Sequence, residues 1–278
     1  MKIILGINAH HADSSACIII NGKLIAAVEE ERINRLKHFS GFPIKSIQTC
    51  LNIAKVSEDE ITDIAFNTKP LSNFKNKLFF YLKNLDFKSS FFPKSFSKKL
   101  NVKKYLHEKF KLNQKVKFHY IEHHLSHIAS AYYPSNFKDA YGLSIDGSGD
   151  FLTMAFAKCN QNKIEIFKKE YFPNSLGIFY HAMTQFLGFN SYGDEYKIMG
   201  LAAYGTPIYF DKIKKNLFIE DNNSIFKLNL DYFNHHKKTF KYITGENLII
   251  DQIYSNRLIL LFEKEIKDKY NSEKFKIN

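Results

Sequence analysis

The residues of this chain best suited to chemistry are two histidines four positions apart and an aspartate further along. His123 and His127 lie in the run Glu-His-His-Leu-Ser-His, where a helix places both imidazoles on one face. Asp146 ends an apolar run that predicts a strand, and a Gly-Ser-Gly turn suited to phosphate follows it. Two imidazole nitrogens and one carboxylate oxygen suit a divalent transition metal with positions open for a substrate. A helical histidine pair alone is more often structural, so the predicted metal site depends on Asp146.

A second polar segment is the loop after the first predicted strand. It reads Asn8-Ala-His-His-Ala-Asp-Ser-Ser15 and holds two imidazoles, a carboxylate and two hydroxyls. An ordinary turn, in which Asp13 and Ser14 bond to backbone groups, explains these residues without any function. Alternatively, the loop faces the turn at residues 147–150 across a cleft. A histidine there, with an unperturbed pKa near ~6.5, can act as general base toward an alcohol.

Two further segments contain candidate ligands for an anion. Arg32 and Arg35 lie in a charged loop at residues 29–38, which is either a solvated run of charges or a source of cations for an anionic ligand. Between residues 175 and 205, glycines and Lys197 either punctuate helices or allow the backbone to approach a nucleotide or substrate.

The composition describes a globular chain of 278 residues with a formal net charge of +12. Its 40 basic residues include only three arginines, and arginine is the residue that makes bidentate contacts to bases and phosphates, so a dedicated nucleic-acid reader is disfavoured. Three cysteines without metal-like spacing favour a reducing compartment. The short apolar start predicts no signal peptide, and no run approaches the ~18–20 apolar residues of a membrane span. We therefore expect a cytoplasmic protein with no nucleic-acid or membrane partner.

These candidate residues must be held by alternating strands and helices. Asn21-Gly22 predicts a hairpin between strands at 16–20 and 23–28, and Pro43 suits the first position of a helix at 44–55. A Lys- and Phe-rich insertion at 69–115 has helical character, which phenylalanines on a buried helix face explain better than nucleic-acid binding does. The remaining expected strands span residues 2–8, 61–67, 116–121, 140–146, 151–158 and 164–171, and a further helix spans 124–133.

The order strand, polar turn, strand, hairpin, strand occurs twice, at residues 3–28 and 143–171. Two such units facing each other describe an α/β fold, the duplicated ribonuclease-H-like ATPase fold of sugar kinases, actin and Hsp70. We expect a complete first subdomain at residues 1–142. A second subdomain at 143–278 is expected to be incomplete, because the polar tail beyond residue 205 does not obviously finish a sheet.

Five ordered blocks between residues 3 and 205 resemble the O-carbamoyltransferases of antibiotic and nodulation-factor biosynthesis. The same core also resembles the metal-binding domain of tRNA threonylcarbamoyladenosine synthases. The blocks are Gly6-Ile-Asn-Ala-His-His-Ala-Asp-Ser-Ser-Ala-Cys17, residues 29–38 with Gly41-Phe-Pro43, His123-His-Leu-Ser-His-Ile-Ala-Ser-Ala131, Asp146-Gly-Ser-Gly-Asp150, and Tyr192-Gly-Asp-Glu-Tyr-Lys-Ile-Met-Gly-Leu-Ala-Ala-Tyr-Gly205.

The resemblance implies a two-step reaction. A separate C-terminal domain makes carbamoyl adenylate from carbamoyl phosphate and ATP, and the ATPase-like domain transfers the carbamoyl group to a hydroxyl of a sugar or natural product. His123, His127 and Asp146 would hold a divalent metal, with iron favoured, that polarises the carbamoyl oxygen or anchors the phosphate. His11 and Asp13 match the functional His-x-Asp of the first loop. Contacts to the cofactor or co-substrates are expected from Ser14, Ser15, Arg35, Lys37, His38, Gly147, Ser148, Gly149, Asp150 and Lys197.

The resemblance also implies parts that this sequence does not contain. Family members are longer, take a further metal-binding aspartate from a later segment, and carry the adenylate-forming domain. We therefore expect a fragment, a truncated product, or one subunit that works with a separate adenylate-forming partner. Two other functions are consistent with the sequence: a non-catalytic module that binds nucleotide or a partner, and phosphoryl transfer in the manner of sugar kinases. The kinase alternative is weaker, because kinases of this fold do not need a His-x-x-x-His pair.

Overall fold

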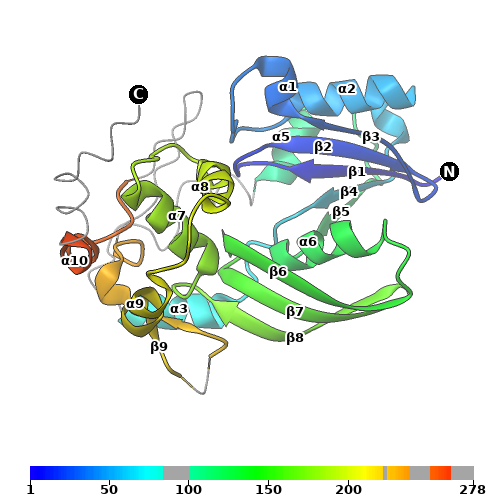
Figure 1. The fold of residues 1–278 in the computed structure, drawn as a ribbon. Helices are drawn as coiled ribbons and strands as arrows, with labels where there is room; N and C mark the ends of the chain where they lie inside the picture. The colour runs from blue at the N-terminus through cyan, green and yellow to red at the C-terminus, as the bar shows by residue number, and fades with distance from the viewer. Residues whose placement is uncertain (84–100, 222–223, 238–250, 264–278) are drawn as a thin grey trace.

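The structure is a computed structural model that describes residues 1–83, 101–221, 224–237 and 251–263. These residues form two larger sheets with helices on and between them (Figure 1). The predicted insertion at 69–115 and the predicted second subdomain at 143–278 each lie partly outside the described residues.

The first sheet consists of β1 (Ile3–Asn8), β2 (Ser15–Ile20), β3 (Lys23–Glu29), β4 (Asp63–Phe66) and β5 (Lys117–Tyr120). Its order is β3-β2-β1-β4-β5. The first three strands are antiparallel, and Asn21 and Gly22, both at positive φ, form the predicted tight turn between β2 and β3. β4 pairs with β1 and β5 pairs with β4, both in parallel. A meander followed by parallel strands is the ribonuclease-H-like arrangement that the sequence predicts.

One face of this sheet packs against α2 (Ile44–Ala54) and α5 (Val102–Lys109). Ile47 of α2 and Leu106 of α5 are fully buried in one apolar core with the strands. Because α5 lies within residues 69–115, part of the predicted insertion contributes to the core of the first subdomain. Pro43 lies immediately before the helix instead of at its first position.

The sequence predicts a loop at residues 29–38, but the structure has a short helix there, α1 (Glu30–Asn34). Glu30 is buried, and its carboxylate accepts hydrogen bonds from the backbone N–H (2.7 Å) and the hydroxyl (2.8 Å) of Ser46 in α2. A buried carboxylate needs such donors, so this contact holds the segment against α2. Arg35, in the left-handed conformation, ends the helix.

The second sheet repeats the opening of the first. It consists of β6 (Asp139–Gly149), β7 (Leu152–Asn160) and β8 (Lys163–Tyr171), which are antiparallel in the order β6-β7-β8. Among the described residues, no strand pairs with the outer edge of β6. The strand order of the two sheets therefore confirms the expectation of a duplicated ribonuclease-H-like fold.

The predicted turn at residues 147–150 begins later than expected. The pairing of β6 with β7 shifts register between Ile145 and Gly149, so Gly147 and Ser148 form an irregularity within the strand. The chain reverses at Asp150 and Phe151, which both have positive φ. The sequence alone does not reveal the later start of the turn, because it does not show that the pairing of β6 with β7 resumes at Gly149 and Leu152.

α6 (His123–Tyr132) lies between the two sheets (Figure 1). It packs on the second sheet, where Ile128 and Tyr132 share a core with residues of β7. Gly142 of β6 allows this close approach, because a Cβ there would lie 2.6 Å from the Ile128 side chain. The helix therefore has one face fixed against the second sheet and presents its first turn to the first subdomain.

A separate apolar core, formed by residues between positions 172 and 262, includes Leu217, Leu228, Phe233 and Leu258. In agreement with the sequence, the residues beyond 205 do not extend the second sheet in the described part of the chain. No helix among the described residues is long and apolar enough to cross a membrane. The helices and strands not yet named are α3 (Phe74–Lys83), α7 (Leu176–Phe186), α8 (Glu195–Ala202), α9 (Phe210–Leu217), β9 (Phe218–Ile219), β10 (Lys227–Leu228), α10 (Asn256–Leu261), and the 3-10 helices η1 (Glu58–Glu60) and η2 (Leu230–Tyr232).

Candidate metal centre and adjoining cavities

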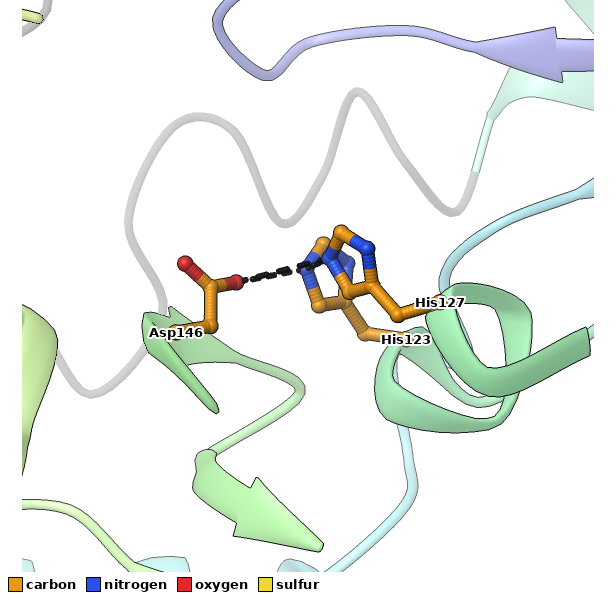
Figure 2. Close-up of side chains that lie close together, drawn as sticks. All are labelled: His123, His127 and Asp146. Carbon is orange, nitrogen blue, oxygen red and sulfur yellow. Dashed lines mark hydrogen bonds and ion pairs between the residues drawn. The ribbon is translucent and has the colours of Figure 1, made fainter. Parts of the chain in front are cut away.

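The three predicted metal ligands converge at the junction of α6 and β6. His123 Nε2 lies 2.8 Å from Asp146 Oδ2 and 2.9 Å from His127 Nε2. His127 Nε2 lies 3.7 Å from the same Asp146 oxygen. Figure 2 shows the Asp146 carboxylate pointing toward both imidazoles, which extend from successive turns of the helix. An aspartate 19 and 23 positions after the two histidines thus completes a set of three ligand atoms that converge on one point.

The fold holds His123 by contacts on both sides. Its backbone N–H donates to Asp150 Oδ2 at 3.0 Å, so Asp150 satisfies an N–H at the start of α6. Gly149 lies under the ring, since a Cβ there would come within 2.0 Å of His123 Cδ2. The glycine that ends β6 and the aspartate that follows it therefore fix the position of the histidine rather than only shaping a turn.

The electrostatics of the site favour an ionised carboxylate. Burial opposes the charge of Asp146, but the contacts with His123 and His127 outweigh it, and Gly147 N–H donates to Asp146 Oδ1 at 2.6 Å. Together these contacts hold the pKa of Asp146 well below its ordinary value. His123 is buried, whereas the His127 side chain is 52% exposed, so the site opens to solvent on the His127 side.

The donor set fits a transition metal. Tetrahedral ligands at bond lengths of about 2.0–2.1 Å lie about 3.3 Å from one another, and the observed separations of 2.8, 2.9 and 3.7 Å bracket that value. Two imidazoles and one carboxylate also form the 2-His-1-carboxylate set typical of Fe(II). His124 is excluded from this set because it is fully buried and its Nδ1 lies 2.8 Å from Ser144 Oγ. Burial lowers the pKa of His124 and keeps its ring neutral.

A cavity of about 420 Å³ adjoins the carboxylate side of this centre. The first polar loop, the bulge of β6, the start of α7 and the segment before α8 all contribute to its walls. Ser175 Oγ donates to the carbonyls of Asp146 (3.0 Å) and Gly147 (2.7 Å), which fastens α7 to the bulge. Gly177 permits this contact, since a Cβ there would lie 2.5 Å from Gly147 N.

The two residues predicted to be catalytic both line this cavity. The centroid of the His11 ring lies 5.5 Å from that of His123, which places the first loop beside the candidate metal centre. Asp13 adopts positive φ, and its Oδ1 lies 2.8 Å from His38 Nδ1. The structure therefore places the first loop, with its neighbour His38, around the same cavity as Gly147 and Ser148, which is the arrangement expected if the loop faces that turn across a cleft.

The residues predicted to contact cofactor or co-substrates divide into two groups. His38, Gly147 and Ser148 line this cavity, and Ser15 lines the larger cavity described below. Six others line neither of the two cavities: Ser14, Arg35, Lys37, Gly149, Asp150 and Lys197. The assignment of any of these residues to a ligand stays a prediction.

Several residues of the second group have structural partners. Ser14 is buried and donates to the Gly41 carbonyl at 2.7 Å. Both carboxylate oxygens of Asp150 accept hydrogen bonds outside α6 as well, from the Thr68 hydroxyl and the Lys69 N–H, each at 2.7 Å. These contacts join the end of β4 to the second sheet.

The two lysines predicted to contact the cofactor also have protein partners. Lys197 Nζ lies 2.7 Å from Asp194 Oδ1, and this contact raises the pKa of the lysine. Lys37 lies over the ring of Tyr196, with its Nζ 5.9 Å from the centroid. Both lysines thus lie at the start of α8, beside the cavity wall instead of within it.

Sequence reasoning missed a second histidine–carboxylate pair in the cavity wall. His181 of α7 is buried, and its Nδ1 contacts Glu195 Oε1 at the start of α8. In both His38 and His181, Nδ1 is hydrogen-bonded to a carboxylate. The Nε2 atom of each ring is buried and has no hydrogen-bond partner among the described residues. The available signal was a histidine inside the apolar helical run Leu-Gly-Ile-Phe-Tyr-His-Ala-Met, with a glutamate fourteen residues later.

A larger cavity of about 730 Å³ adjoins the centre on the other side of the histidines. It lies between the first sheet and α6, and its walls include Gly6, Cys17, His123 and His127. Gly6 and Cys17 face each other across paired strands, and burial raises the pKa of the Cys17 thiol. The candidate centre therefore lies where two cavities meet, with Asp146 on one and His127 on the other.

Comparison with known proteins identifies similar chains. The family described as "Carbamoyltransferase N-terminus" matches residues 3–258. The chain is 38% identical over 245 residues to the uncharacterized protein sll1178 of Synechocystis, covering 84% of this chain and 40% of that protein. It is 32% identical over 225 residues to the nodulation protein NolNO of Sinorhizobium fredii, covering 81% of this chain and 32% of that protein.

A third relative and a solved structure are also similar to this chain. The uncharacterized protein MJ1051 of Methanocaldococcus jannaschii is 33% identical, with 73% of this chain and 33% of that protein covered. The chain thus spans about two fifths or less of the length of these relatives. Among solved structures, YeaZ of Pseudomonas aeruginosa matches at a TM-score of 0.36 and 11% identity, over 62% of this chain and 68% of that one.

Proposed function

Because the chain belongs to the carbamoyltransferase N-terminal family, we propose that it is the part of a carbamoyltransferase that transfers the carbamoyl group. The acceptor in this proposal is a hydroxyl of a small molecule, of the sugar or natural-product class, held in the cavity of about 420 Å³. The observation that carries the proposal is the convergence of His123, His127 and Asp146 at the edge of the cavity lined by His11 and Asp13.

His123, His127 and Asp146 would hold a divalent transition metal, and their 2-His-1-carboxylate chemistry favours Fe(II). When bound, such a metal supplies Lewis-acid polarisation of the carbamoyl oxygen or anchors the phosphate of the carbamoyl adenylate. The Asp146 carboxylate is held in its ionised form by His123, His127 and Gly147, and the ionised carboxylate is the form that binds a metal.

The residues of the first loop would handle the acceptor. In the transfer step the acceptor oxygen bonds to the carbamoyl carbon, and the bond from that carbon to the phosphate oxygen breaks. AMP leaves with the electron pair, and the hydroxyl proton passes to His11 as general base. Asp13 holds His38, on its own side of the cavity, through their 2.8 Å contact. Gly147 and Ser148 lie beside the leaving phosphate in this arrangement.

The carbamoyl adenylate requires carbamoyl phosphate and ATP as co-substrates. We propose that a separate adenylate-forming domain or subunit supplies it, in agreement with the greater length of the relatives.

The proposal is tested in two steps. The purified chain is reconstituted anaerobically with Fe(II), Zn(II) or Mn(II), and the bound metal is measured by elemental analysis. Carbamoyl phosphate, ATP and a sugar acceptor are then supplied together with the separately expressed remainder of the Synechocystis relative, and the product is analysed by mass spectrometry. We expect one metal per chain and a carbamoylated acceptor.

Different outcomes separate the alternatives. A chain that binds none of these metals overturns the assignment of His123, His127 and Asp146. Binding of metal and of an ATP analogue, with no carbamoylated product, indicates a non-catalytic binding module instead. Phosphorylated acceptor would indicate phosphoryl transfer.

A further inference from the structure

We propose that the Nε2 atoms of His38 and His181 form a subsite that accepts hydrogen bonds from hydroxyl groups of a neutral, sugar-like acceptor, and that Tyr192 covers this subsite in the free protein. Both imidazoles line the cavity of about 420 Å³. The hydroxyls bound here are those that do not react, so the subsite selects the acceptor. The inference rests on the proposed function only in taking this cavity to hold the acceptor.

The carboxylate at the other nitrogen of each ring decides what Nε2 can do. Asp13 Oδ1 lies 2.8 Å from His38 Nδ1, and Glu195 Oε1 contacts His181 Nδ1. Burial opposes the charge of Glu195, but its hydrogen bonds, chiefly with His181, hold the pKa of Glu195 below its ordinary value. Because an ionised carboxylate only accepts hydrogen bonds, Nδ1 must carry the proton of the neutral ring. Nε2 then has a lone pair that accepts from a hydroxyl group.

The two Nε2 atoms are buried, and neither has a hydrogen-bond partner among the described residues. Burying a polar atom without a partner is unfavourable, so a ligand that supplies a donor gains binding energy there. Buried ring nitrogens without partners also occur at His124, His235 and His236, but none of these three lines either of the two cavities. Of the five histidines, only His38 and His181 lie where a ligand can approach.

Tyr192 lies against both imidazoles, in the segment between α7 and α8. Its ring meets the His38 ring edge-on with centroids 5.2 Å apart, and its centroid lies 6.5 Å from that of His181. A Cβ on the next residue, Gly193, would lie 2.9 Å from His38 Nε2, so this segment covers that atom. Gly193 and Gly188 have φ of 79° and 95°, and such positions give a segment the backbone freedom to move.

The charge of the cavity wall disfavours an anionic occupant. Asp13, Asp146 and Glu195 line the cavity, and among the described residues no lysine or arginine does. The wall is therefore acidic in a chain whose formal net charge is +12. Even with a metal on Asp146, two carboxylates remain, and like charges placed together are unfavourable. A neutral compound with several hydroxyl groups fits this wall better than a phosphorylated one.

The first test reads the protonation of the rings in the full, unmodified chain. Nitrogen-15 NMR is recorded near pH ~8.5, about two units above the ordinary histidine pKa of ~6.5, with single histidine-to-glutamine variants used only for assignment. We expect the proton on Nδ1 in His38 and His181. His119 is the matched control, because its Nε2 lies 2.7 Å from Asp63 Oδ1 and should carry the proton instead. A proton on Nε2 of His38 or His181 would overturn the proposal.

The second test measures the binding of methyl glucoside, methyl galactoside and methyl mannoside by calorimetry. We expect at least one to bind, and His181→Phe to weaken that binding about ten-fold, which is the size of one lost hydrogen bond. His119→Phe, at the carboxylate-paired histidine of the first sheet, should bind as the unmodified chain does. Glucose 6-phosphate should bind at least ten-fold more weakly than methyl glucoside. Binding of none of the three glycosides, or equal affinity in His181→Phe, contradicts the subsite.

The third test follows the cover with a fluorophore, since the chain contains no tryptophan. The emission of Tyr192→Trp should change when a glycoside binds, because the side chain must move to uncover the two nitrogens. Tyr204→Trp, at a residue that is 90% exposed, is the control and should not respond. Constant emission from Tyr192→Trp would show that it covers nothing. None of the three tests uses a metal or a carbamoyl donor, so their failure is distinguishable from a failure of carbamoyl transfer.

Discussion

The three histidines at the start of α6 have different environments, and the environment decides what each can do. His123 is buried between Gly149 and Asp146, His124 is buried on Ser144, and His127 is half exposed. Only the first and third point toward the carboxylate (Figure 2). His124 is thus a structural residue, whereas His123 and His127 are candidate ligands, although all three side chains are identical and lie within five positions.

We expect Asp146→Asn to reduce metal affinity by more than ~10–100-fold, because the loss of even an outer-shell partner of a metal typically has an effect of that size. Titration with Fe(II) or Zn(II) followed by calorimetry measures the change. Asp139→Asn at the exposed start of the same strand serves as the control and should leave the affinity unaltered. Equal affinities for the two variants would show that Asp146 is not a ligand.

At the pair of His181 and Glu195, removal of one partner should lower the unfolding free energy more than removal of both. Glu195→Ala leaves a buried imidazole without its hydrogen-bond partner, and we expect a loss of about 1–3 kcal/mol of unfolding free energy. The double variant His181→Leu with Glu195→Ala should recover part of that loss. Chemical denaturation of the single and double variants completes the cycle, and strict additivity would contradict the pairing.

At the scale of elements, Asp150 joins three parts of the fold. Its carboxylate accepts from the N–H groups of His123 and Lys69 and from the Thr68 hydroxyl, so it ties α6 and the end of β4 to the second sheet. α3 reinforces the same junction, since the Phe80 ring lies 5.8 Å from Phe151 and 5.2 Å from Phe172. The segment at 69–115 thus connects the two sheets as well as completing the first core.

Gly149→Ala should disturb the candidate metal centre without removing a ligand. The new Cβ would lie 2.0 Å from His123 Cδ2, so the imidazole must move away from Asp146. We expect metal affinity to fall while the secondary structure measured by circular dichroism persists. Gly200→Ala in α8, where a Cβ meets nothing within 4 Å, is the control and should bind metal normally. Unaltered affinity in Gly149→Ala would contradict the position of His123.

At the scale of the whole molecule, the described residues form three apolar cores, and a buried titratable group lies beside the one that includes Phe233. His235 is 2% exposed among Phe172 and Phe233, and its Nε2 lies 2.9 Å from the Pro173 carbonyl. Burial lowers the pKa of His235 to about 4. The folded protein therefore keeps this ring neutral at a pH where the unfolded chain would protonate it.

This difference predicts that stability falls as the pH is lowered from about 6.5 toward 4. In that interval the unfolded state binds a proton that the folded state does not, so acid favours unfolding, by up to about 3 kcal/mol for this group. Denaturant titrations at several pH values measure the slope. In His235→Phe the slope should be shallower, with His236 and the carboxylates still contributing; an identical slope would contradict the assignment.

The sequence by itself determined the local elements and the order of the fold. The Asn21-Gly22 turn, the alternating apolar strands and the helical spacing of His123 and His127 are encoded within a few residues, because backbone preferences and side-chain periodicity are local. The repeat of a three-strand unit likewise identified the duplicated fold, which the order of both sheets confirms.

Only the tertiary structure decided which polar residues share a site. The carboxylate of Asp150, a residue predicted to contact a cofactor, instead accepts hydrogen bonds from the N-terminus of α6 and from the segment just after β4. His181 and Glu195 contact each other in the cavity wall. Those contacts depend on how α6, α7 and β6 pack, and packing brings together residues that no local pattern relates.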